Sequence, residues 1–352
     1  MSKIAIVLFN LGGPDSPDAV EPFLYNLFSD PAIIRLPRFL RLFLAGKISR
    51  KRTPIAQEIY RHIGGKSPIL QETQNQARAL ETALADLGEL KVFIAMRYWH
   101  PGSDVTAMEV KGYAPDRVVL LPLYPQFSTT TTKSSLIEWY RAAGQAGLLA
   151  PQVATSAICC YPTASGLIEA QSALISSVLR ELADERSVRL LFSAHGLPER
   201  IVRKGDPYAW QVEQTAAQIA MRLGIKDLDW QLCYQSRVGP MKWIGPATDD
   251  EIRRAGADGK SLVVAPIAFV SEHSETLVEL DIEYRKLAEE SGVSTYRRVP
   301  AVGCHPAFID ALADLIRQNL RRAPGNENSL FSHMDSRFCP AQHSGCPLVI
   351  GR

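Results

Sequence analysis

Short apolar runs alternate along the chain with longer segments in which apolar residues recur every three or four positions. The short runs predict strands, and the longer segments predict amphipathic helices. The predicted strands are Ile4–Phe9, Val92–Met96, Arg117–Leu121, Val153–Ile158, Arg189–Phe192, Trp230–Tyr234 and Ser261–Ala265. The predicted helices include Gln71–Leu87, Ser165–Leu182, Trp210–Leu223 and His305–Arg322. Nearly continuous apolar strands that alternate with helices predict an α/β fold, with parallel sheets covered on both faces.

Two internal echoes indicate that the chain has two similar halves. The segment Leu8–Pro14 resembles Leu191–Pro198, and Val118–Pro122 resembles Leu262–Pro266. In each case an apolar strand ends in a loop that contains glycine or proline. We therefore expect two Rossmann-like lobes, residues 1–175 and 176–323, each a parallel sheet flanked by helices, with the active cleft between them. A single large doubly wound sheet is the alternative.

Composition narrows the class of protein. The chain has 352 residues, and its 39 basic and 37 acidic side chains give a net charge of +2, too balanced for a nucleic-acid-binding protein. The first apolar run is too short for a signal peptide, and no stretch reaches the roughly 20 apolar residues of a membrane span. Six cysteines are too few for a disulfide scaffold at this length. We expect a cytoplasmic protein that binds no nucleic acid.

The familiar phosphate-binding and hydrolase motifs are absent. The loop Asn10–Pro14 follows a strand but lacks G-x-G-x-x-G, the pattern of dinucleotide sites. Gly65, Lys66 and Ser67 copy the end of a P-loop, but Tyr60 stands where its first glycine is required. Neither H-E-x-x-H nor G-x-S-x-G occurs. Nucleotide-dependent chemistry is therefore disfavoured.

An acidic segment with a histidine, Ser271–Tyr284, is the strongest chemical signal. As a helix it would carry one acidic face, made of Glu272, Glu275, Glu279 and Glu283, and an apolar face at Leu277, Leu280, Tyr284 and Leu287. Like charges four residues apart destabilise a helix, and a divalent cation would relieve their repulsion. Imidazole beside carboxylate, as in His273 with Glu275, suits ferrous iron or zinc. A solvated helix face is the alternative interpretation.

His195 is the second candidate. It follows a predicted strand in a tight loop that contains Gly196 and Pro198, and the carboxyl ends of parallel strands are where α/β proteins bind ligands. A structural histidine is the alternative. Amphipathic and aromatic side chains suited to a large flat ligand are Tyr98, Trp99, Tyr124, Phe127, Trp243 and Phe269.

Residues 36–52 combine apolar side chains with cations and contain no acid. Such a segment can lie in a lipid interface, where its bases meet anionic headgroups. We expect it to form a membrane or ligand lip on the first lobe, although packing as a surface helix is the alternative. The tail, residues 324–352, is rich in Gly, Asn, Ser, His and Pro and shows no periodicity, so we expect it to be loosely ordered or merely draped on the surface.

A series of motifs from about Ile4 to about Leu320 resembles the ferrochelatase family, whose bacterial members are lyases that insert ferrous iron into protoporphyrin IX to make protohaem, the last step of haem synthesis. These motifs are Leu8–Pro14, Arg52–Pro54, Tyr60–Pro68, Met96–Tyr98, Tyr124–Ser128, Ser193–Pro198, Gln235–Pro240, Trp243–Pro246 and Ser271–Leu277. The resemblance implies that protoporphyrin IX and Fe²⁺ are the substrates, and that the protein is attached peripherally to the inner face of the membrane.

The resemblance also implies roles for individual residues. His195 resembles the pocket histidine that takes a pyrrole proton or holds the metal, and Glu275 with His273 resembles the opposing acid and its partner. The metal path would comprise His195, Glu275, Glu272 and Glu279. The implied propionate contacts are Arg52, Tyr60 and Ser67, and the implied lining of the macrocycle is Leu11, Arg97, Tyr98, Trp243 and Phe269. A planar apolar ring with two carboxylates calls for such a set.

Turnover would require no cofactor, since iron is a substrate. Some members of the family hold a [2Fe–2S] cluster through four cysteines, three of them in a tail, but this tail contains only Cys339 and Cys346. We predict that no cluster is bound; one could form only if other cysteines joined these two. The alternatives to protoporphyrin metallation are iron insertion into coproporphyrin or metal insertion into another tetrapyrrole. A non-catalytic haem- or metal-binding protein is the alternative of a different class.

Overall fold

The computed structural model describes residues 2–149, 152–182, 187–237, 239, 241–322, 329–334 and 336–348. The chain forms two compact units: residues 1–159 with 313–331, and residues 160–312 with 332–352. The sequence analysis placed the boundary near residue 175, within helix α6 (Ser165–Glu181). In the structure α6 packs on helix α8 (Tyr208–Leu223) and on strand β7 (Ser261–Pro266), so the whole helix belongs to the second unit.

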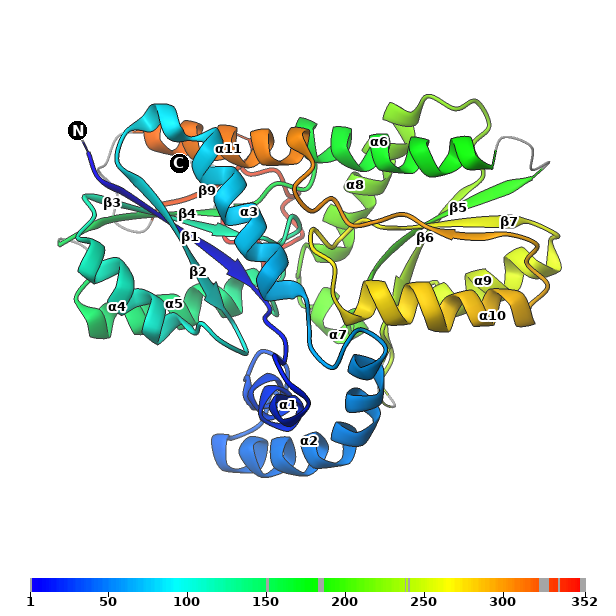
Figure 1. Cartoon of the computed structure of the whole chain (residues 1–352), viewed down its shortest axis with the longest axis horizontal. Coiled ribbons are helices and arrows are strands. Elements are labelled where there is room, and N and C mark those ends of the chain that lie inside the picture. The colour runs from blue at the N-terminus through cyan, green and yellow to red at the C-terminus, as the bar shows by residue number, and fades with distance from the viewer. Residues whose placement is uncertain are drawn as a thin grey trace. The chain divides into compact units, whose positions relative to one another are not determined.

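The first unit contains a five-stranded sheet with the strand order β2-β1-β3-β4-β9. Its strands are β1 (Ile4–Asn10), β2 (Leu90–Met96), β3 (Arg117–Pro122), β4 (Ala154–Cys160) and β9 (Ser329–Ser332). Strands β1 to β4 pair in parallel. In Figure 1, helices α4 and α5 cover one face of this sheet and α3 covers the other.

The helices of the first unit are α1 (Val20–Ser29), α2 (Arg38–Arg61), α3 (Ile69–Ala83), α4 (Ser103–Tyr113) and α5 (Thr132–Ala146), with 3₁₀ turns at Pro17–Ala19 and Ala85–Leu87. Helices α1 and α2 pack on one another. Helix α11 (Pro306–Arg321) begins in the second unit and ends in the first.

The second unit contains a four-stranded parallel sheet with the order β6-β5-β7-β8. Its strands are β5 (Val188–His195), β6 (Trp230–Gln235), β7 and β8 (Tyr296–Arg298). Across each sheet, the first four strands follow the same order: the second strand of the unit, then the first, the third and the fourth. The repeat seen in the sequence therefore reflects a repeated topology.

The remaining helices of the second unit are α7 (Glu199–Val202), α8, α9 (Thr248–Ala257), the π-helix η3 (Glu275–Glu283) and α10 (Tyr284–Glu290). Helix α9 contacts the strands β5, β6 and β7, and α10 packs on α9 and β8. Helices α6 and α8 lie on the opposite face of the sheet, as Figure 1 shows.

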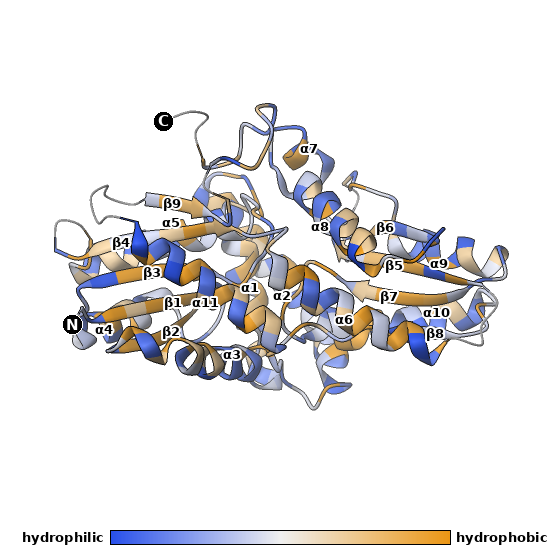
Figure 2. Cartoon of the chain, turned by 90° about the horizontal axis from the view of Figure 1, so that it is seen from above, coloured by the Kyte–Doolittle hydropathy of each residue, from blue (hydrophilic) through white to orange (hydrophobic). Residues whose placement is uncertain are grey.

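The central strands are buried on both faces, which explains their continuous apolar sequences. Every residue of β1 and of β7 is buried, and Figure 2 shows the strands as mainly hydrophobic against helices with hydrophilic outer faces. A fully enclosed parallel sheet requires such composition. The predicted α/β class, with two parallel sheets flanked by helices, is confirmed.

The tail, expected to be loosely ordered or merely draped on the surface, makes specific contacts in its described residues 329–334 and 336–348, whereas 324–328, 335 and 349–352 lie outside the described residues. Strand β9 joins the first sheet. Arg337 donates hydrogen bonds to the carbonyl oxygens of Cys339, Pro340, His343 and Leu348. The indole of Trp210 contacts the rings of Phe338 and His343. Contacts distant in sequence order this segment, and its lack of periodicity cannot reveal them.

Candidate active site

The candidate site of the second unit lies at the carboxyl ends of its parallel strands. His195 is the last residue of β5 and pairs in register with Gln235, the last residue of β6. The loop 267–274 follows β7 and leads into the π-helix η3. Ligands of open α/β sheets bind at this edge, so the position of His195 agrees with the sequence analysis.

His195 and Glu275 form a hydrogen-bonded ion pair, with His195 Nδ1 3.0 Å from Glu275 Oε2. Their side chains are 38% and 30% exposed, so both remain accessible to a ligand. Burial lowers the pKa of His195, but the charge and hydrogen bond of Glu275 outweigh it, and the net pKa is raised. Burial raises the pKa of Glu275, but His195 more than compensates and lowers it to about 2. Glu275 is therefore ionised at neutral pH.

Glu279 lies four residues after Glu275 on η3, and residues at the end of β6 hold its carboxylate in place. Its carboxylate accepts hydrogen bonds from Gln235 Nε2 at 3.0 Å, from the backbone N–H of Ser236 at 2.8 Å and from the hydroxyl of Tyr284 at 3.2 Å. Burial, and then the charge of Glu275, raise the pKa of Glu279. Two carboxylates four residues apart thus share one site, and a cation would stabilise both.

His273 lies in the loop before η3, within electrostatic range of Glu275. Its ring meets the edge of the Phe269 ring at a centroid separation of 4.5 Å and an angle of 83°. Burial lowers the pKa of His273, so the imidazole is held neutral. Its Nδ1 accepts the backbone N–H of Thr276 at 3.3 Å, which leaves the proton of the neutral ring on Nε2.

The structure gives the residues of the acidic segment different surroundings. The carboxylate of Glu272 pairs with Arg298 Nη1 at 2.8 Å and accepts the backbone N–H of Ala301 at 3.0 Å, and its place in the metal path stays a prediction. Glu283 is exposed. The segment is a π-helix whose buried residues are Thr276, Val278 and Leu280, rather than an α-helix with an apolar face that includes Leu277. The wider turn of a π-helix changes which side chains share a face.

Trp243 completes the aromatic surroundings of this strand edge. It forms an isolated bridge with Pro198, in the loop that follows His195. A side chain added at Gly196 would lie 3.3 Å from the Trp243 ring and 3.0 Å from the carbonyl oxygen of Gln235. Glycine at 196 therefore allows the loop, the indole and β6 to approach closely.

Several residues of the first unit that were predicted to contact the porphyrin lie close to the ends of β1 and β2. The backbone N–H of Tyr98 donates to the carbonyl of Leu11 at 3.0 Å, and Ser67 N–H donates to Pro14 O at 2.8 Å. Arg97, directly after β2, is fixed by Asp30 Oδ2 at 2.7 Å. Leu11, Ser67 and Arg97 are thus grouped by the fold. Arg52 lies on α2, with its guanidinium 5.9 Å from the ring centroid of Phe28.

Tyr98 and Tyr60 occupy a different environment from the one expected. Both belong to the buried apolar cluster under α1 and α2, and Tyr98 is only 2% exposed. The Tyr98 hydroxyl donates to Asp30 Oδ2 at 2.8 Å. Their rings therefore pack in the interior of the first unit, and their role as porphyrin contacts stays a prediction.

Comparison with known proteins decides the family. Residues 3–320 match the family model described as ferrochelatase. The chain belongs to the ferrochelatase family. It is 54% identical to "Ferrochelatase" of Caulobacter vibrioides, over 98% of this chain and 97% of that protein, and 46% identical to "Ferrochelatase" of Pelagibacter ubique, over 99% of each. This ferrochelatase is accordingly a lyase that inserts ferrous iron into protoporphyrin to form protohaem, as the sequence analysis predicted.

A solved structure supports the fold alone. The chain is similar to that of "SirB from Bacillus subtilis with Fe3+", with a TM-score of 0.52 and 15% identity, covering 93% of this chain and 99% of that one. At that identity the likeness concerns architecture, and the activity rests on the close relatives.

The segment predicted as a lip forms the first part of helix α2 in this ferrochelatase. Phe39 and Phe43, one turn apart, are 72% and 60% exposed, and Leu36 and Leu40 are also exposed. Lys47 lies 4.5 Å above the Phe43 ring. In the part of the chain that the structure describes, no helix has the length and apolar character required to cross a membrane.

Two thiols of the second unit lie beside one amide, and a third contacts one of them. Gln211 Nε2 lies 3.0 Å from Cys339 Sγ and 3.6 Å from Cys160 Sγ, and the Cys339 thiol hydrogen-bonds Cys346. A [2Fe–2S] cluster held by cysteines needs four thiolates. Among residues with described positions, no three or more His, Cys, Asp or Glu side chains are arranged to hold a metal ion. The absence of a cluster stays a prediction.

Sequence reasoning missed several residues that support the site. Gln235 and Ser236 hold Glu279, and Asp30 holds both Arg97 and Tyr98. Gln235 and Ser236 lie in a motif typical of the family, so their place directly after a strand was an available signal. Asp30 showed no such signal, because Arg97 and Tyr98 lie 67 or more residues away from it in the sequence.

Proposed function

We propose that the His195–Glu275 pair is the base that removes the two pyrrole protons during iron insertion. The observation that carries this proposal is the 3.0 Å contact between His195 Nδ1 and Glu275 Oε2 at the end of β5. A neutral imidazole that donates its Nδ1 proton to a carboxylate presents a lone pair on Nε2. That nitrogen can accept a proton from a bound porphyrin.

The charge balance of the reaction explains why a carboxylate backs the histidine. A free-base porphyrin loses two N–H protons as Fe²⁺ enters, and the product is neutral haem. His195 takes one proton at a time and becomes an imidazolium, which the ionised Glu275 stabilises. The proton then leaves to solvent, so the pair is restored for the second transfer. A general base of this kind contributes about 10²–10⁴-fold to the rate.

Glu279 and Glu275 supply the route for the cation. They are adjacent along one face of η3, and both are partly buried. The raised pKa of Glu279 reflects unfavourable charge that an arriving Fe²⁺ would neutralise. Carboxylate and imidazole ligands suit ferrous iron. In this proposal Glu272 is excluded from the route by its ion pair with Arg298.

Protoporphyrin contacts are proposed for each lobe taken by itself. In the second lobe Trp243 and Phe269 offer aromatic surface near His195 and His273. In the first lobe Leu11 offers apolar surface, and Arg52, Ser67 and Arg97 offer donors suited to the propionates. Tyr60 and Tyr98 act beneath them as packing residues, since both are buried.

The protein attaches peripherally to the inner face of the membrane through the exposed apolar residues of α2. Phe39 and Phe43 insert at the interface, while Lys47, Arg50 and Lys51 meet anionic headgroups. Protoporphyrin is apolar, so a lip at the membrane would receive it from the lipid. The catalytic lobes then work on the cytoplasmic side, with no resident cofactor.

Anaerobic incubation with Fe²⁺ and porphyrin, followed by loss of porphyrin fluorescence, tests the proposal. His195→Ala should lower the insertion rate by about 10²–10⁴-fold while the thermal unfolding midpoint stays near that of the wild type. Coproporphyrin in a parallel series should be metallated more slowly than protoporphyrin. Wild-type turnover in folded His195→Ala would refute the role of the pair.

A further inference from the structure

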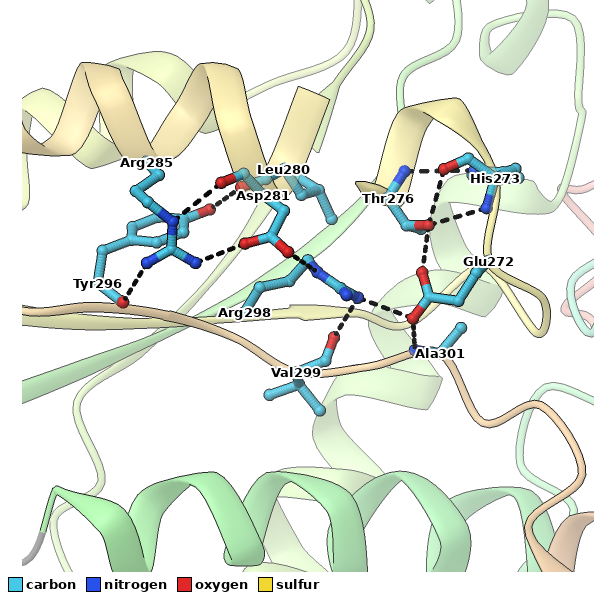
Figure 3. A network of polar contacts seen from close by, with 10 residues as sticks. All are labelled: Glu272, His273, Thr276, Leu280, Asp281, Arg285, Tyr296, Arg298, Val299 and Ala301. Atoms are coloured by element: carbon cyan, nitrogen blue, oxygen red, sulfur yellow. Dashed lines mark hydrogen bonds and ion pairs between the residues drawn. The ribbon is translucent and has the colours of Figure 1, made fainter. Parts of the chain in front are cut away.

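Thr276 connects His273 to the acidic residue that lies outside the metal route. Its hydroxyl donates to Glu272 Oε2 and accepts the backbone N–H of His273 at 3.0 Å. Its own backbone N–H reaches the ring nitrogen Nδ1 of His273 at 3.3 Å. Thr276 is fully buried. One residue therefore contacts both the backbone and the ring of His273, as Figure 3 shows.

The direction of these hydrogen bonds is fixed by Glu272. An ionised carboxylate only accepts, so the Thr276 hydroxyl must turn its proton toward Glu272. The lone pairs of the hydroxyl then face the His273 N–H, which donates to them. A neutral group in place of Glu272 would leave the hydroxyl free to rotate toward the His273 carbonyl, 3.1 Å away. The charge of Glu272 thus sets the orientation of the turn.

Glu272 is in turn held by a rigid part of the sheet. Arg298, the last residue of β8, binds Glu272 Oε1 through Nη1 at 2.8 Å and Asp281 Oδ2 through Nε at 3.3 Å. Glu272 precedes η3 and Asp281 lies near its end, so one guanidinium contacts both ends of the π-helix. Asp281 also pairs with Arg285, which donates to the carbonyl of Tyr296 at 3.1 Å. Figure 3 shows this continuous chain of contacts from β8 to His273.

We propose that Thr276 is a positioning residue for iron insertion, and that Glu272 and Arg298 act through it to orient His273 and to keep its proton on Nε2. The inference rests on the proposed function, because it assigns His273 a place beside Glu275 in the reaction. It also gives Glu272 a role other than metal binding. Errors of about 1 Å in a catalytic group cost up to about 10²-fold in rate, so the hydroxyl should matter although it touches no substrate.

The matched variants are Thr276→Val, which keeps the shape and removes the hydroxyl, and Thr276→Ser, which keeps the hydroxyl. We expect Thr276→Val to lower kcat about 10- to 100-fold, with KM for protoporphyrin within about twofold of the wild type. Thr276→Ser should restore kcat to within about threefold. Glu283→Gln, which removes an exposed acid from the same π-helix, is the control and should leave kcat unchanged.

A spectroscopic readout separates positioning from general damage. The ¹⁵N chemical shifts of the His273 ring, recorded on the full-length protein without porphyrin or metal, should show the Nε2–H form in the wild type and in Thr276→Ser. Thr276→Val keeps the backbone N–H that faces Nδ1 but loses the hydroxyl that holds the His273 backbone, so the loop should no longer keep that N–H in place, and the shifts should move toward a mixture of the two ring tautomers. This arm does not depend on turnover, so it stands even if His195 proves not to be the base.

Glu272→Gln provides the second test, including the case in which Thr276→Val does not fold. We expect it to lower kcat in the same direction and to leave KM for Fe²⁺ unchanged, because Glu272 is not a metal ligand. A raised KM for Fe²⁺ with normal kcat would overturn the inference and return Glu272 to the metal route. Wild-type kcat in folded Thr276→Val, or equal losses in the Val and Ser variants, would overturn it as well.

Discussion

Replacement of Glu275 by Gln isolates the electrostatic part of the catalytic pair. Glutamine keeps the size of the side chain and can still accept the Nδ1 proton of His195 through its amide oxygen. What disappears is the negative charge 3.0 Å from the imidazole. The variant therefore asks how much of the basicity of His195 depends on that charge.

The structure sets the expected size of the loss in kcat/KM. Burial raises the pKa of Glu275, yet His195 lowers it overall from 4.5 to about 2, which corresponds to roughly 3 kcal/mol in favour of the charged carboxylate. The same interaction favours the charged imidazole. Because the His195 side chain is 38% exposed, solvent screening reduces this to about 1–3 kcal/mol. We therefore expect Glu275→Gln to lower kcat/KM about 10- to 100-fold.

The pH dependence has a defined sign. Burial lowers the pKa of His195, but Glu275 raises it overall, so the base form accumulates, and the insertion rate rises, as pH increases through that raised value. Without the charge of Glu275 the rising limb should move to lower pH. The assay is anaerobic porphyrin metallation across pH, followed by fluorescence, with free Fe²⁺ held constant.

A double-mutant cycle gives the result that would refute this reasoning. If the two residues act as one unit, adding Glu275→Gln to His195→Ala should cost little beyond the single His195→Ala loss. Losses that multiply in the double variant would show that Glu275 works independently of His195. A rising pH limb that does not move in Glu275→Gln would equally show that the charge of Glu275 does not set the basicity of His195.

Three further predictions concern the membrane, the packing and the metal content. Changing Phe39 and Phe43 to Ser should reduce sedimentation with anionic vesicles, and salt should weaken the wild-type binding; equal sedimentation of the two proteins would contradict the lip. Gly166→Ala should destabilise the protein by roughly 1–3 kcal/mol in thermal melts, because the new methyl group would lie 2.1 Å from Ala307 O; Gly112→Ala, which meets nothing within 4 Å, is the control and should be neutral or stabilising. Protein purified without added iron or porphyrin should show no iron–sulfur charge-transfer bands, and bands with about two irons per chain would disprove that.

Local pattern predicted the strands β1 to β7 and the helices α3, α6, α8 and α11 of this ferrochelatase. Its parallel strands are enclosed on both faces, so their sequences are continuously apolar and easy to recognise. The repeated strand-and-loop segments predicted two lobes, and both sheets have the same order for their first four strands. The rule that ligands bind at strand ends placed His195 where the structure has it.

The tertiary structure alone decided which partner each acid meets. Glu272, Glu275 and Glu279 are equivalent in a sequence, but Arg298, 26 residues after Glu272, pairs with Glu272, whereas His195 pairs with Glu275. The π-helix and the anchoring of Arg97 by Asp30 depend on partners that are equally remote from local pattern. Periodicity reports which face of an element is buried on average. It carries no information about which distant charge a given side chain meets, because that depends on how the whole chain folds.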